Sequence, residues 1–279
     1  MAIRERHGEM SMVPGPTPNS AGLRNFAVTL SYNGTRYGGW QIQNNTTSIQ
    51  QKLQEAIAQA TSEHVIVRGS GRTDSGVHAI GQVATFRLEN WRAPADRLVP
   101  AINRYLPRSI VLKRCREAVL EFDPTRDARS KRYRYTVRNS RVPDALQYSF
   151  QWWYPRPLEV EPMKQAASLL VGTHDFKAFE TLGSPRKTSV RTIYDLQVLV
   201  FEHDDGQDIW IEIEADGFLY NMVRNIAGAL CEVGVGRFGY RWIQSVLESK
   251  VRDSSSQTAP PQGLCLVKVN YPDSLFLTT

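Results

Sequence analysis

The sequence predicts an α+β protein made of two ferredoxin-like halves, each with the element order β-α-β-β-α-β. Three observations lead to this fold class. Short segments with alternating apolar residues indicate strands, longer segments with apolar residues every three or four positions indicate helices, and the two kinds of segment follow in the same order twice. Because edge strands of the two halves are free to pair, we expect one continuous mixed or antiparallel sheet with helices on one face and a central cleft.

The first half is expected over residues 24–125, after a flexible N-terminal tail over residues 1–23 that is rich in Pro, Gly and Ser. In chain order its expected elements are a strand over 26–32, a helix capped by Ser48, strands over 65–69 and 80–88, a helix opened by Pro94, and a strand over 110–115. This order is the complete ferredoxin-like unit.

The second half is expected over residues 126–272, before a short tail over residues 273–279. Its expected elements are a strand over 132–138, a helix over 161–171, hairpin strands over 192–201 and 209–215, a helix over 217–233 ended by Gly234, a short helix over 242–248 and a strand over 264–269. The loop over 181–191 is expected to be mobile and basic.

The composition is that of an ordinary folded protein with a moderate basic bias: 41% of the residues are hydrophobic, the net charge is +6 and the pI is near 9.3. This bias is compatible with a nucleic-acid partner but does not require one. No apolar run is long enough to span a membrane, and the N-terminus lacks the apolar core of a secretory signal. We therefore expect no membrane partner.

Cysteine and histidine spacing argues against a metal site. Cys115, Cys231 and Cys265 lie far apart in apolar stretches, a pattern that fits a reducing cytoplasm better than a disulfide framework. The five histidines show no metal-ligand spacing. The chain has no Gly-x-x-x-x-Gly-Lys loop, which argues against a nucleotide cofactor, and no other cofactor motif, so we expect no cofactor.

One polar loop, with the sequence GRTDSGVHA over residues 71–79, is the strongest candidate for chemistry. Asp74 can begin a common turn, with Arg72 solvated beside it. In the alternative interpretation, a neighbouring guanidinium keeps the carboxylate ionised, and an aspartate held as an anion above a sheet is a candidate nucleophile or base. The residues alone leave both interpretations open.

This loop, with the Gly-Gln-Val that follows it, resembles the signature of the TruA family of tRNA pseudouridine synthases. The family usually has Ala at the position of Ser75, which is a small residue exchanged for another. Four further segments resemble family blocks in the family's order, namely SYNGTRYGGWQ at 31–41, KRYRY at 131–135, MVRNI at 222–226 and GLCLV at 263–267. Together the five segments span nearly the whole chain.

The resemblance implies an enzyme that isomerises uridine to pseudouridine at positions 38, 39 and 40 of the anticodon arm of tRNA. It implies Asp74 as the catalytic residue, acting as nucleophile or base in the central catalytic cleft. Attack on C1′, attack on C6 and removal of a sugar proton all remain open. It further implies a homodimer that shares one tRNA.

Four further residues are implied as substrate-binding. The resemblance aligns Tyr133 with the tyrosine that contacts the target uracil, and Arg224 with the arginine that pairs with the catalytic aspartate. Arg224 also stands out in an otherwise apolar helix, where an enclosed guanidinium needs an anion, unless it extends to a nearby surface. By the same resemblance, Arg72 helps to extrude the target base and Leu264 supplies an apolar contact near it.

Basic residues crowd the strand that carries Tyr133. Its alternation places Tyr133 and Tyr135 on one face and Arg132 and Arg134 on the other. Cations interleaved with aromatic rings suit RNA phosphates and a flipped base, although a core tyrosine beside a solvated basic face gives the same pattern. The residues expected to bind RNA are Arg129, Lys131, Arg132 and Arg134.

Two other functions are alternatives to an RNA-modifying enzyme. A non-catalytic RNA-binding protein on the same fold would keep its function after Asp74→Asn, whereas the enzyme would lose turnover. A glycoside-cleaving enzyme would need two carboxylates across one cleft, and Asp74 is the only acid that stands out.

Overall fold

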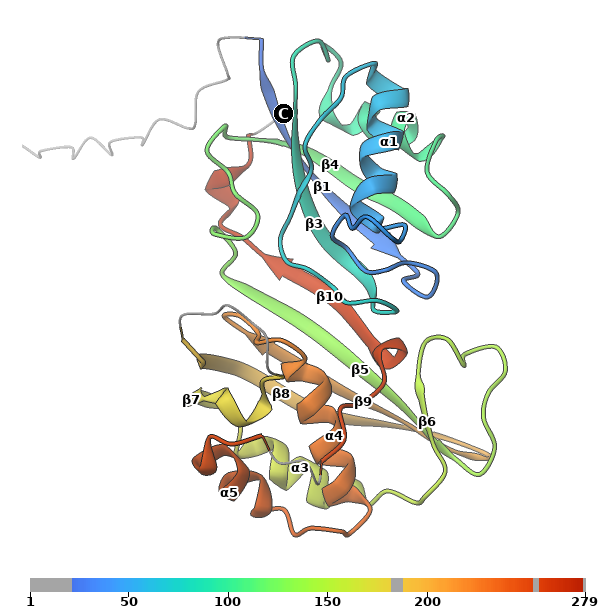
Figure 1. The fold of residues 1–279 in the computed structure, drawn as a ribbon, viewed down its shortest axis with the longest axis vertical. Coiled ribbons are helices and arrows are strands. Elements are labelled where there is room, and N and C mark those ends of the chain that lie inside the picture. The colour runs from blue at the N-terminus through green and yellow to red at the C-terminus, as the bar shows by residue number, and fades with distance from the viewer. Residues whose placement is uncertain (1–21, 182–187, 253–255, 278–279) are drawn as a thin grey trace, which may run out of the picture.

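A computed structural model describes residues 22–181, 188–252 and 256–277 of the chain (Figure 1). In this part of the chain the strands form one ten-stranded sheet, whose main path runs β4-β1-β3-β10-β5-β9-β8-β7. The expected α+β fold class is confirmed. None of the described helices is long and apolar enough to cross a membrane.

The N-terminal half contains the complete predicted unit. Its elements are β1 (Arg24–Tyr32), α1 (Ile49–Thr61), β2 (Arg68–Gly69), β3 (His78–Leu88), α2 (Leu98–Asn103) and β4 (Ile110–Ala118). The strand order is β4-β1-β3, with β2 paired to β3, so the first and third strands of the unit lie at its centre. Ser48 caps α1 as expected, since its hydroxyl accepts a hydrogen bond from the Gln51 backbone N–H at 3.2 Å.

The C-terminal half repeats this arrangement with insertions. Its elements are β5 (Ser130–Ser140), β6 (Trp152–Tyr154), α3 (Val160–Ser168), β7 (Gly172–Asp175), β8 (Val190–His203), β9 (Gly206–Ala215), α4 (Met222–Gly234), α5 (Trp242–Ser249) and β10 (Leu264–Asn270). Its order β10-β5-β9-β8 is the same spatial arrangement as β4-β1-β3-β2 in the first half. The short strands β6 and β7 are additions that the sequence did not predict.

The last strand joins the two halves. β10 pairs antiparallel with β5, where Leu266 lies opposite Tyr133, and parallel with β3, where Cys265 lies opposite His78. The strand that ends the second half therefore completes the sheet next to the beginning of β3. The residues just before β3 form the GRTDSGVHA loop, so this loop lies where the halves meet.

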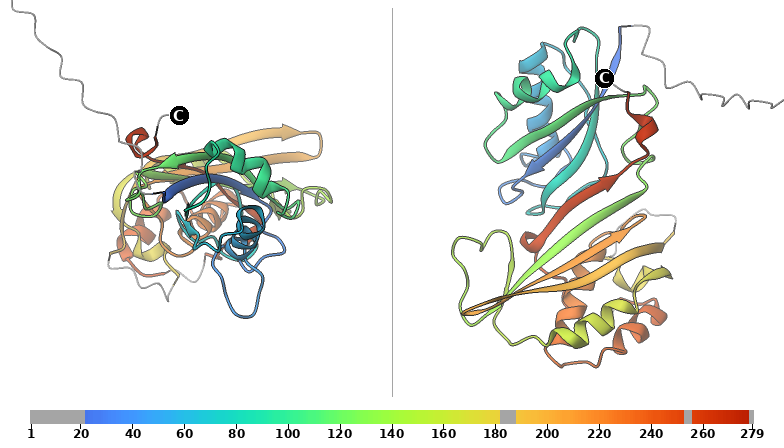
Figure 2. Two further views of the ribbon diagram at one scale, coloured as in Figure 1. Left: turned by 90° about the horizontal axis from the view of Figure 1, so that it is seen from above. Right: turned by 180° about the vertical axis from the view of Figure 1, so that it is seen from behind.

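Helices of both halves lie on the same side of the curved sheet, as α1 and α4 show in the left view of Figure 2. Every residue of α4 except Arg224 is buried. Apolar residues that alternate along the strands cover the sheet face beneath the helices, as Phe26, Val28 and Leu30 do on β1. The core thus lies between the sheet and its helical layer.

The helix predicted from residue 217 begins instead at Met222. Asn221 has a left-handed conformation at φ 57°, which breaks the helical path before that point. Gly234 is the last helical residue rather than the cap, and the left-handed glycine is Gly236 at φ 75°. A Cβ at Gly234 would lie 2.7 Å from Met163 Sδ, so this glycine allows close packing of α4 on α3.

The division of the halves at 125/126 and the tail over residues 273–279 stay predictions. The described part of this tail contacts the first half. Phe276 forms a bridge with Ala118 and packs against Phe122. Most of the expected N-terminal tail and residues 182–187 of the predicted basic loop lie outside the described residues.

Candidate active site

Asp74 lies in a tight turn at the junction of the halves. Its backbone carbonyl accepts a hydrogen bond from the Val77 N–H at 3.1 Å, and Gly76 adopts φ 80°, which a glycine accommodates without strain. A Cβ at Gly76 would lie 3.2 Å from Pro261, in the segment that leads into β10. Asp74 therefore begins a reverse turn, as one interpretation of the motif predicts. The same turn also places Asp74 next to the second half, as the other interpretation requires.

The Gly-rich segment after β1 holds this turn from one side. The backbone N–H of Trp40 donates to the Thr73 carbonyl at 2.9 Å, and the Ser75 hydroxyl donates to the Tyr37 carbonyl at 3.1 Å. Gly39, at φ 97°, packs so closely that a Cβ would lie 2.5 Å from the Thr73 oxygen. The 31–41 segment, to which the sequence assigned no role, thus supports the Asp74 loop.

A buried polar network holds the loop from below. The Gln82 side chain accepts a hydrogen bond from the Ser70 hydroxyl at 2.6 Å and donates to the Gly71 carbonyl at 3.0 Å and to the Tyr32 hydroxyl at 3.4 Å. The Tyr32 hydroxyl in turn bonds the Thr73 hydroxyl at 2.8 Å. Sequence reasoning missed these residues, although Gln82 lies in the motif and Tyr32 lies on the inward face of a predicted strand.

The charge that acts on Asp74 comes from the other half of the protein. Burial raises the pKa of the Asp74 carboxyl above its ordinary value, and the positive charge of Arg224 opposes that rise. The two side chains form no contact ion pair, so the guanidinium acts on the carboxylate through space. Arg72, which the sequence placed beside Asp74 as the stabilising charge, is exposed, and Arg224 supplies this charge instead.

Arg224 is fixed at the start of α4. Its Nε donates to the Ala259 carbonyl at 2.6 Å, and its Nη1 donates to Asn221 Oδ1 at 2.9 Å. It is the one residue of α4 that is not buried, so it extends from an apolar helix toward the junction. Asp74 supplies the anion expected near Arg224. The orientation of the guanidinium, however, is set by its hydrogen bonds to the two neutral oxygens of Ala259 and Asn221.

Tyr133 belongs to the same site. It is buried, its ring packs edge-on against Phe218 at a centroid distance of 5.1 Å, and Leu266 is its cross-strand neighbour. Burial raises the pKa of the Tyr133 phenol, and the negative charge of Asp74 adds to the effect. Leu264 is buried opposite Tyr135, two residues before Leu266 on β10.

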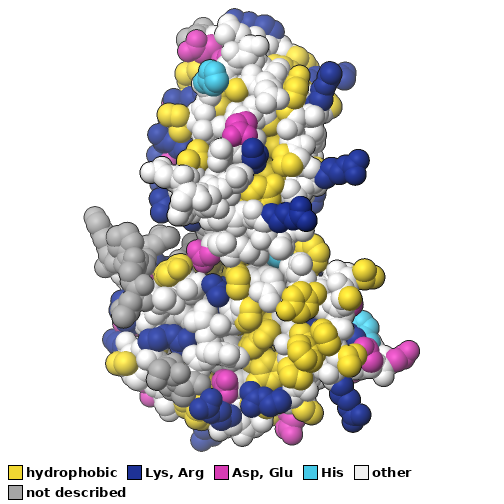
Figure 3. All heavy atoms as spheres, turned by 45° about the vertical axis from the view of Figure 1, so that its right-hand side comes forward, with side chains coloured by type: hydrophobic (Ala, Val, Ile, Leu, Met, Phe, Trp, Pro, Cys, Tyr) yellow, Lys and Arg dark blue, Asp and Glu magenta, His cyan; other side chains and the backbone are white. Residues whose placement is uncertain are grey.

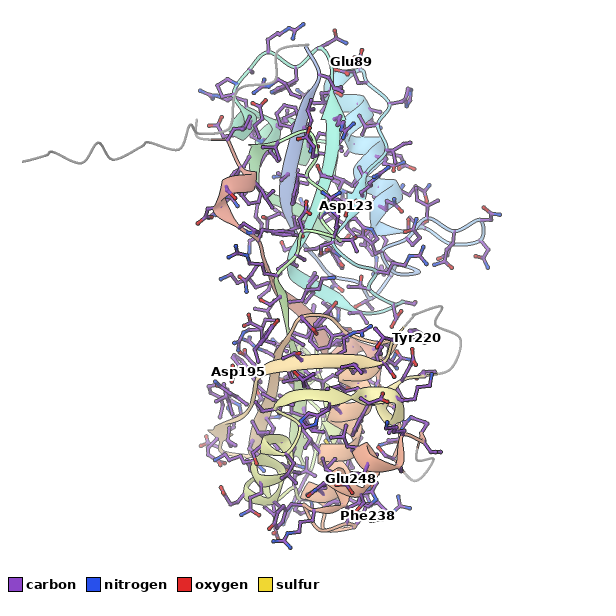
Figure 4. All side chains as sticks on the ribbon, turned by 90° about the vertical axis from the view of Figure 1, so that its left-hand side faces the viewer. Glu89, Asp123, Asp195, Tyr220, Phe238 and Glu248 are labelled. Carbon is purple, nitrogen blue, oxygen red and sulfur yellow. The ribbon has the colours of Figure 1, made fainter. Side chains whose placement is uncertain are left out.

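Arg132 and Arg134 lie on the other face of the sheet and are already paired. Arg132 binds Asp195 at 2.9 Å, and it also contacts two glutamates of β9. Arg134 binds Glu212 at 2.6 Å, and its guanidinium lies 3.6 Å from the centre of the Trp210 ring. Figure 4 shows Asp195 on the side of the C-terminal half away from Tyr220, which precedes α4.

This arrangement shows that the sequence overstates the free positive charge along β5, while the assignment of Arg132 and Arg134 to RNA binding stays a prediction. The sequence around β5 shows many cations and a single acid, but the carboxylates that balance them come from β8 and β9, more than sixty residues away along the chain. Strand alternation places Arg132 and Arg134 opposite the face of Tyr133. Lys131 lies on the Tyr133 face, and its ammonium donates to the Ser70 carbonyl at 2.6 Å, at the entry of the Asp74 loop. Arg129 is exposed just before β5.

No group of three or more His, Cys, Asp or Glu side chains that could hold a metal occurs among the described residues. Two ferredoxin-like halves share one sheet, and an aspartate, a tyrosine and an arginine interact electrostatically where the halves meet. A family model described as tRNA pseudouridine synthase matches residues 29–125 and 166–272. The chain belongs to this family of tRNA pseudouridine synthases, and to its TruA class, as the sequence motifs indicated.

Curated relatives match along nearly the whole chain. A protein named tRNA pseudouridine synthase A from Acetivibrio thermocellus is 45% identical over 249 residues, which cover 89% of this chain and all of the relative. A protein of the same name from a Thermoanaerobacter species is 43% identical over 250 residues, with the same coverage. A chain in a solved H/ACA ribonucleoprotein bound to substrate RNA matches with a TM-score of 0.34 and 13% identity, over 75% of this chain and 43% of that one. A similarity this weak does not define the fold.

Proposed function

We propose that this enzyme isomerises uridine to pseudouridine at positions 38, 39 and 40 of the anticodon arm of tRNA, with Asp74 as its catalytic residue. The convergence of Asp74, Arg224 and Tyr133 at the junction of the halves carries the proposal, together with membership of the family. The three residues come from three separate sequence motifs, so a purely structural role for the loop would not require them to meet.

The reaction is an isomerisation. The N1–C1′ bond breaks, the uracil turns, a C5–C1′ bond forms, and the proton lost from C5 is balanced by one gained at N1. The Asp74 carboxylate would serve by attack on C1′, by attack on C6 or by removal of a sugar proton. In each route it acts as an anion, and at neutral pH the positive charge of Arg224 favours that form.

Tyr133 has a narrower role in this proposal. Burial raises the pKa of its phenol, so the hydroxyl stays protonated near neutral pH and is a poor base. The ring is held by Phe218 and contacts the uracil through its face, while the hydroxyl can donate a hydrogen bond. Leu264 and its neighbour Leu266 would form the apolar floor of the base pocket.

The exposed Arg72 would enter the RNA when the target nucleotide leaves the stack, which costs a few kcal/mol. Arg129 and Lys131 lie on or near the Tyr133 face and remain proposed RNA contacts. A homodimer that shares one tRNA belongs to the same proposal, and sedimentation of the enzyme with and without tRNA tests it. A cytoplasmic location is also proposed, because all three cysteines are free thiols.

The proposal is tested with unmodified tRNA that carries tritium at uracil C5, since bond formation at C5 releases the label to water. The wild-type enzyme should release tritium, and transcripts with cytidine at positions 38, 39 and 40 should release none. Asp74→Asn should release none from either transcript and still bind tRNA. Tritium release by the Asn variant at the wild-type rate would remove Asp74 from the chemistry and favour a binding role for the loop.

A further inference from the structure

The surface beside the Asp74 loop contains a cavity of about 500 Å³. The residues that line it, most of them of polar or charged types, are Asn33, Thr35, Arg36, Pro107, Arg108, Ser109 and Ser149. A neighbouring hollow of about 340 Å³ shares Asn33, Arg108 and Ser109, so the two form one groove. In Figure 1 the segment after β1 and the loop between β5 and β6 approach each other on this side of the molecule. The cavity thus spans the outer edge of the junction between the halves.

Two arginines make this cavity basic, and they differ from those of β5. Arg36 and Arg108 are exposed, and neither has a carboxylate partner among the described residues. None of the described residues that line the cavity is acidic. By contrast, Arg132 and Arg134 have their guanidinia bound by carboxylates on the far face of the sheet. Figure 3 shows a hydrophobic patch on the C-terminal half below the waist, while Lys and Arg side chains lie on both halves.

Neutral groups of the cavity add hydrogen-bonding capacity. Asn33 Oδ1 accepts from both the backbone N–H and the hydroxyl of Thr35, at 3.1 and 2.6 Å. Its Nδ2 therefore remains a donor without a partner among the described residues. The Ser109 hydroxyl bonds the Tyr37 hydroxyl at 2.7 Å, which fixes the Ser109 turn to the Asn33 turn.

The wall of the cavity is continuous with the support of the catalytic loop. The Gly34 N–H donates to His78 Nδ1 at 3.0 Å, and His78 Nε2 is 2.8 Å from the Ser149 carbonyl across the junction. A Cβ at Gly34 would lie only 2.0 Å from the Val77 carbonyl oxygen, so the turn and the loop pack without a gap. An anion in the cavity would therefore lie next to the loop that carries Asp74.

We propose that this cavity binds a backbone phosphate of the substrate tRNA, gripped by Arg36 and Arg108. A planar guanidinium group can donate two parallel hydrogen bonds to two oxygens of one phosphate, and the Asn33 amide supplies a neutral donor. The exposed position of both arginines suits a polymer that lies across the surface better than an enclosed small anion. The inference rests on tRNA being the substrate and assigns the phosphate contact to a site other than β5.

The test is the salt dependence of tRNA binding by Arg36→Ala, Arg108→Ala and the double variant. Each lost phosphate contact should reduce the slope of log K against log salt by about 1. The weaker binding of tRNA should raise KM more than it lowers kcat. Arg36→Lys keeps the positive charge but not the planar guanidinium, so its KM should lie between those of the wild type and Arg36→Ala. Lys164→Ala on α3 is the control, because it removes the same charge from an exposed site remote from the cavity.

Inorganic phosphate, added at constant ionic strength, tests whether the cavity also binds a free phosphate ion. Competition by phosphate for tRNA in the wild type but not in the double variant would support the site. A double variant with the wild-type slope and Kd would overturn the proposal, as would an equal change in Lys164→Ala. Tritium release by the wild type is scored separately, so failure of this site and failure of the proposed reaction are distinguishable.

Discussion

Replacement of Gln82 by leucine tests whether the network beneath the Asp74 loop positions Asp74, the proposed catalytic residue. The side chain is fully buried and accepts from the Ser70 hydroxyl while it donates to the Gly71 carbonyl. Leucine is similar in size but cannot form either bond. The two loop groups would then be left without their partner at the entry of the loop.

The structure sets the expected size of two effects. A buried polar group left unpaired costs about 1–3 kcal/mol, so two such groups should lower the free energy of unfolding by about 2–6 kcal/mol. A displacement of a catalytic group by about 1 Å can cost about 100-fold in rate, so we expect kcat to fall by about 10- to 100-fold. The Kd for tRNA should change little, because Gln82 is buried beneath the loop and does not face the surface.

The assay compares tritium release, tRNA binding and urea denaturation for Gln82→Leu and Gln50→Leu. Gln50 is a buried glutamine of α1 that accepts from the Ile42 N–H at 3.0 Å and donates to the Val67 carbonyl at 2.8 Å. Both variants should lose stability, but only Gln82→Leu should lose kcat beyond that loss. Equal kcat in both variants at equal stability would refute a positioning role for Gln82.

Four further outcomes follow from the same site. Burial raises the pKa of Asp74, so its carboxyl contributes stability below its ordinary pKa and loses it as pH rises through the raised value; Asp74→Asn should therefore be at least as stable as the wild type in urea at pH 7. Arg224→Met removes the opposing charge and should move the acid limb of the pH–rate profile to higher pH, whereas Arg224→Lys should not. Tyr133→Phe should retain tRNA binding, and full activity would exclude the hydroxyl from proton transfer. Gly39→Ala should lower kcat and stability, because its Cβ would meet the Thr73 oxygen at 2.5 Å in a left-handed conformation; a neutral result would show that the loop can shift freely.

Most of the fold could be predicted from the sequence because each strand buries one face. Alternating residues such as Phe26 and Val28 on β1 reveal that face without knowledge of the partner strands. The start of α4 could not be predicted, since the left-handed conformation of Asn221 depends on contacts with Thr181 and Arg224. Short strands such as β6 also escape, because three residues are too few to show a period.

Those residues of the candidate site that are unusual in their local sequence could be predicted. Asp74 stands in a distinctive loop, and Arg224 is conspicuous in an apolar helix. The state of the β5 arginines could not be read locally, because Glu212 and Asp195 reach them only after the sheet has formed. Gln82 was hidden for a related reason: a buried amide has meaning only through the backbone groups that surround it.

The place of β10 in the sheet has a consequence for biogenesis. β10 is the last of the described strands in chain order, yet it lies in the middle of the sheet between β3 and β5, and the segment before it brings Pro261 against the Asp74 turn. A chain that ends before residue 264 lacks β10, the strand that joins the half that carries Asp74 to the half that carries Arg224. The proposed site can therefore assemble only after this strand has been synthesised, and a chain cut before residue 264 should not release tritium from tRNA.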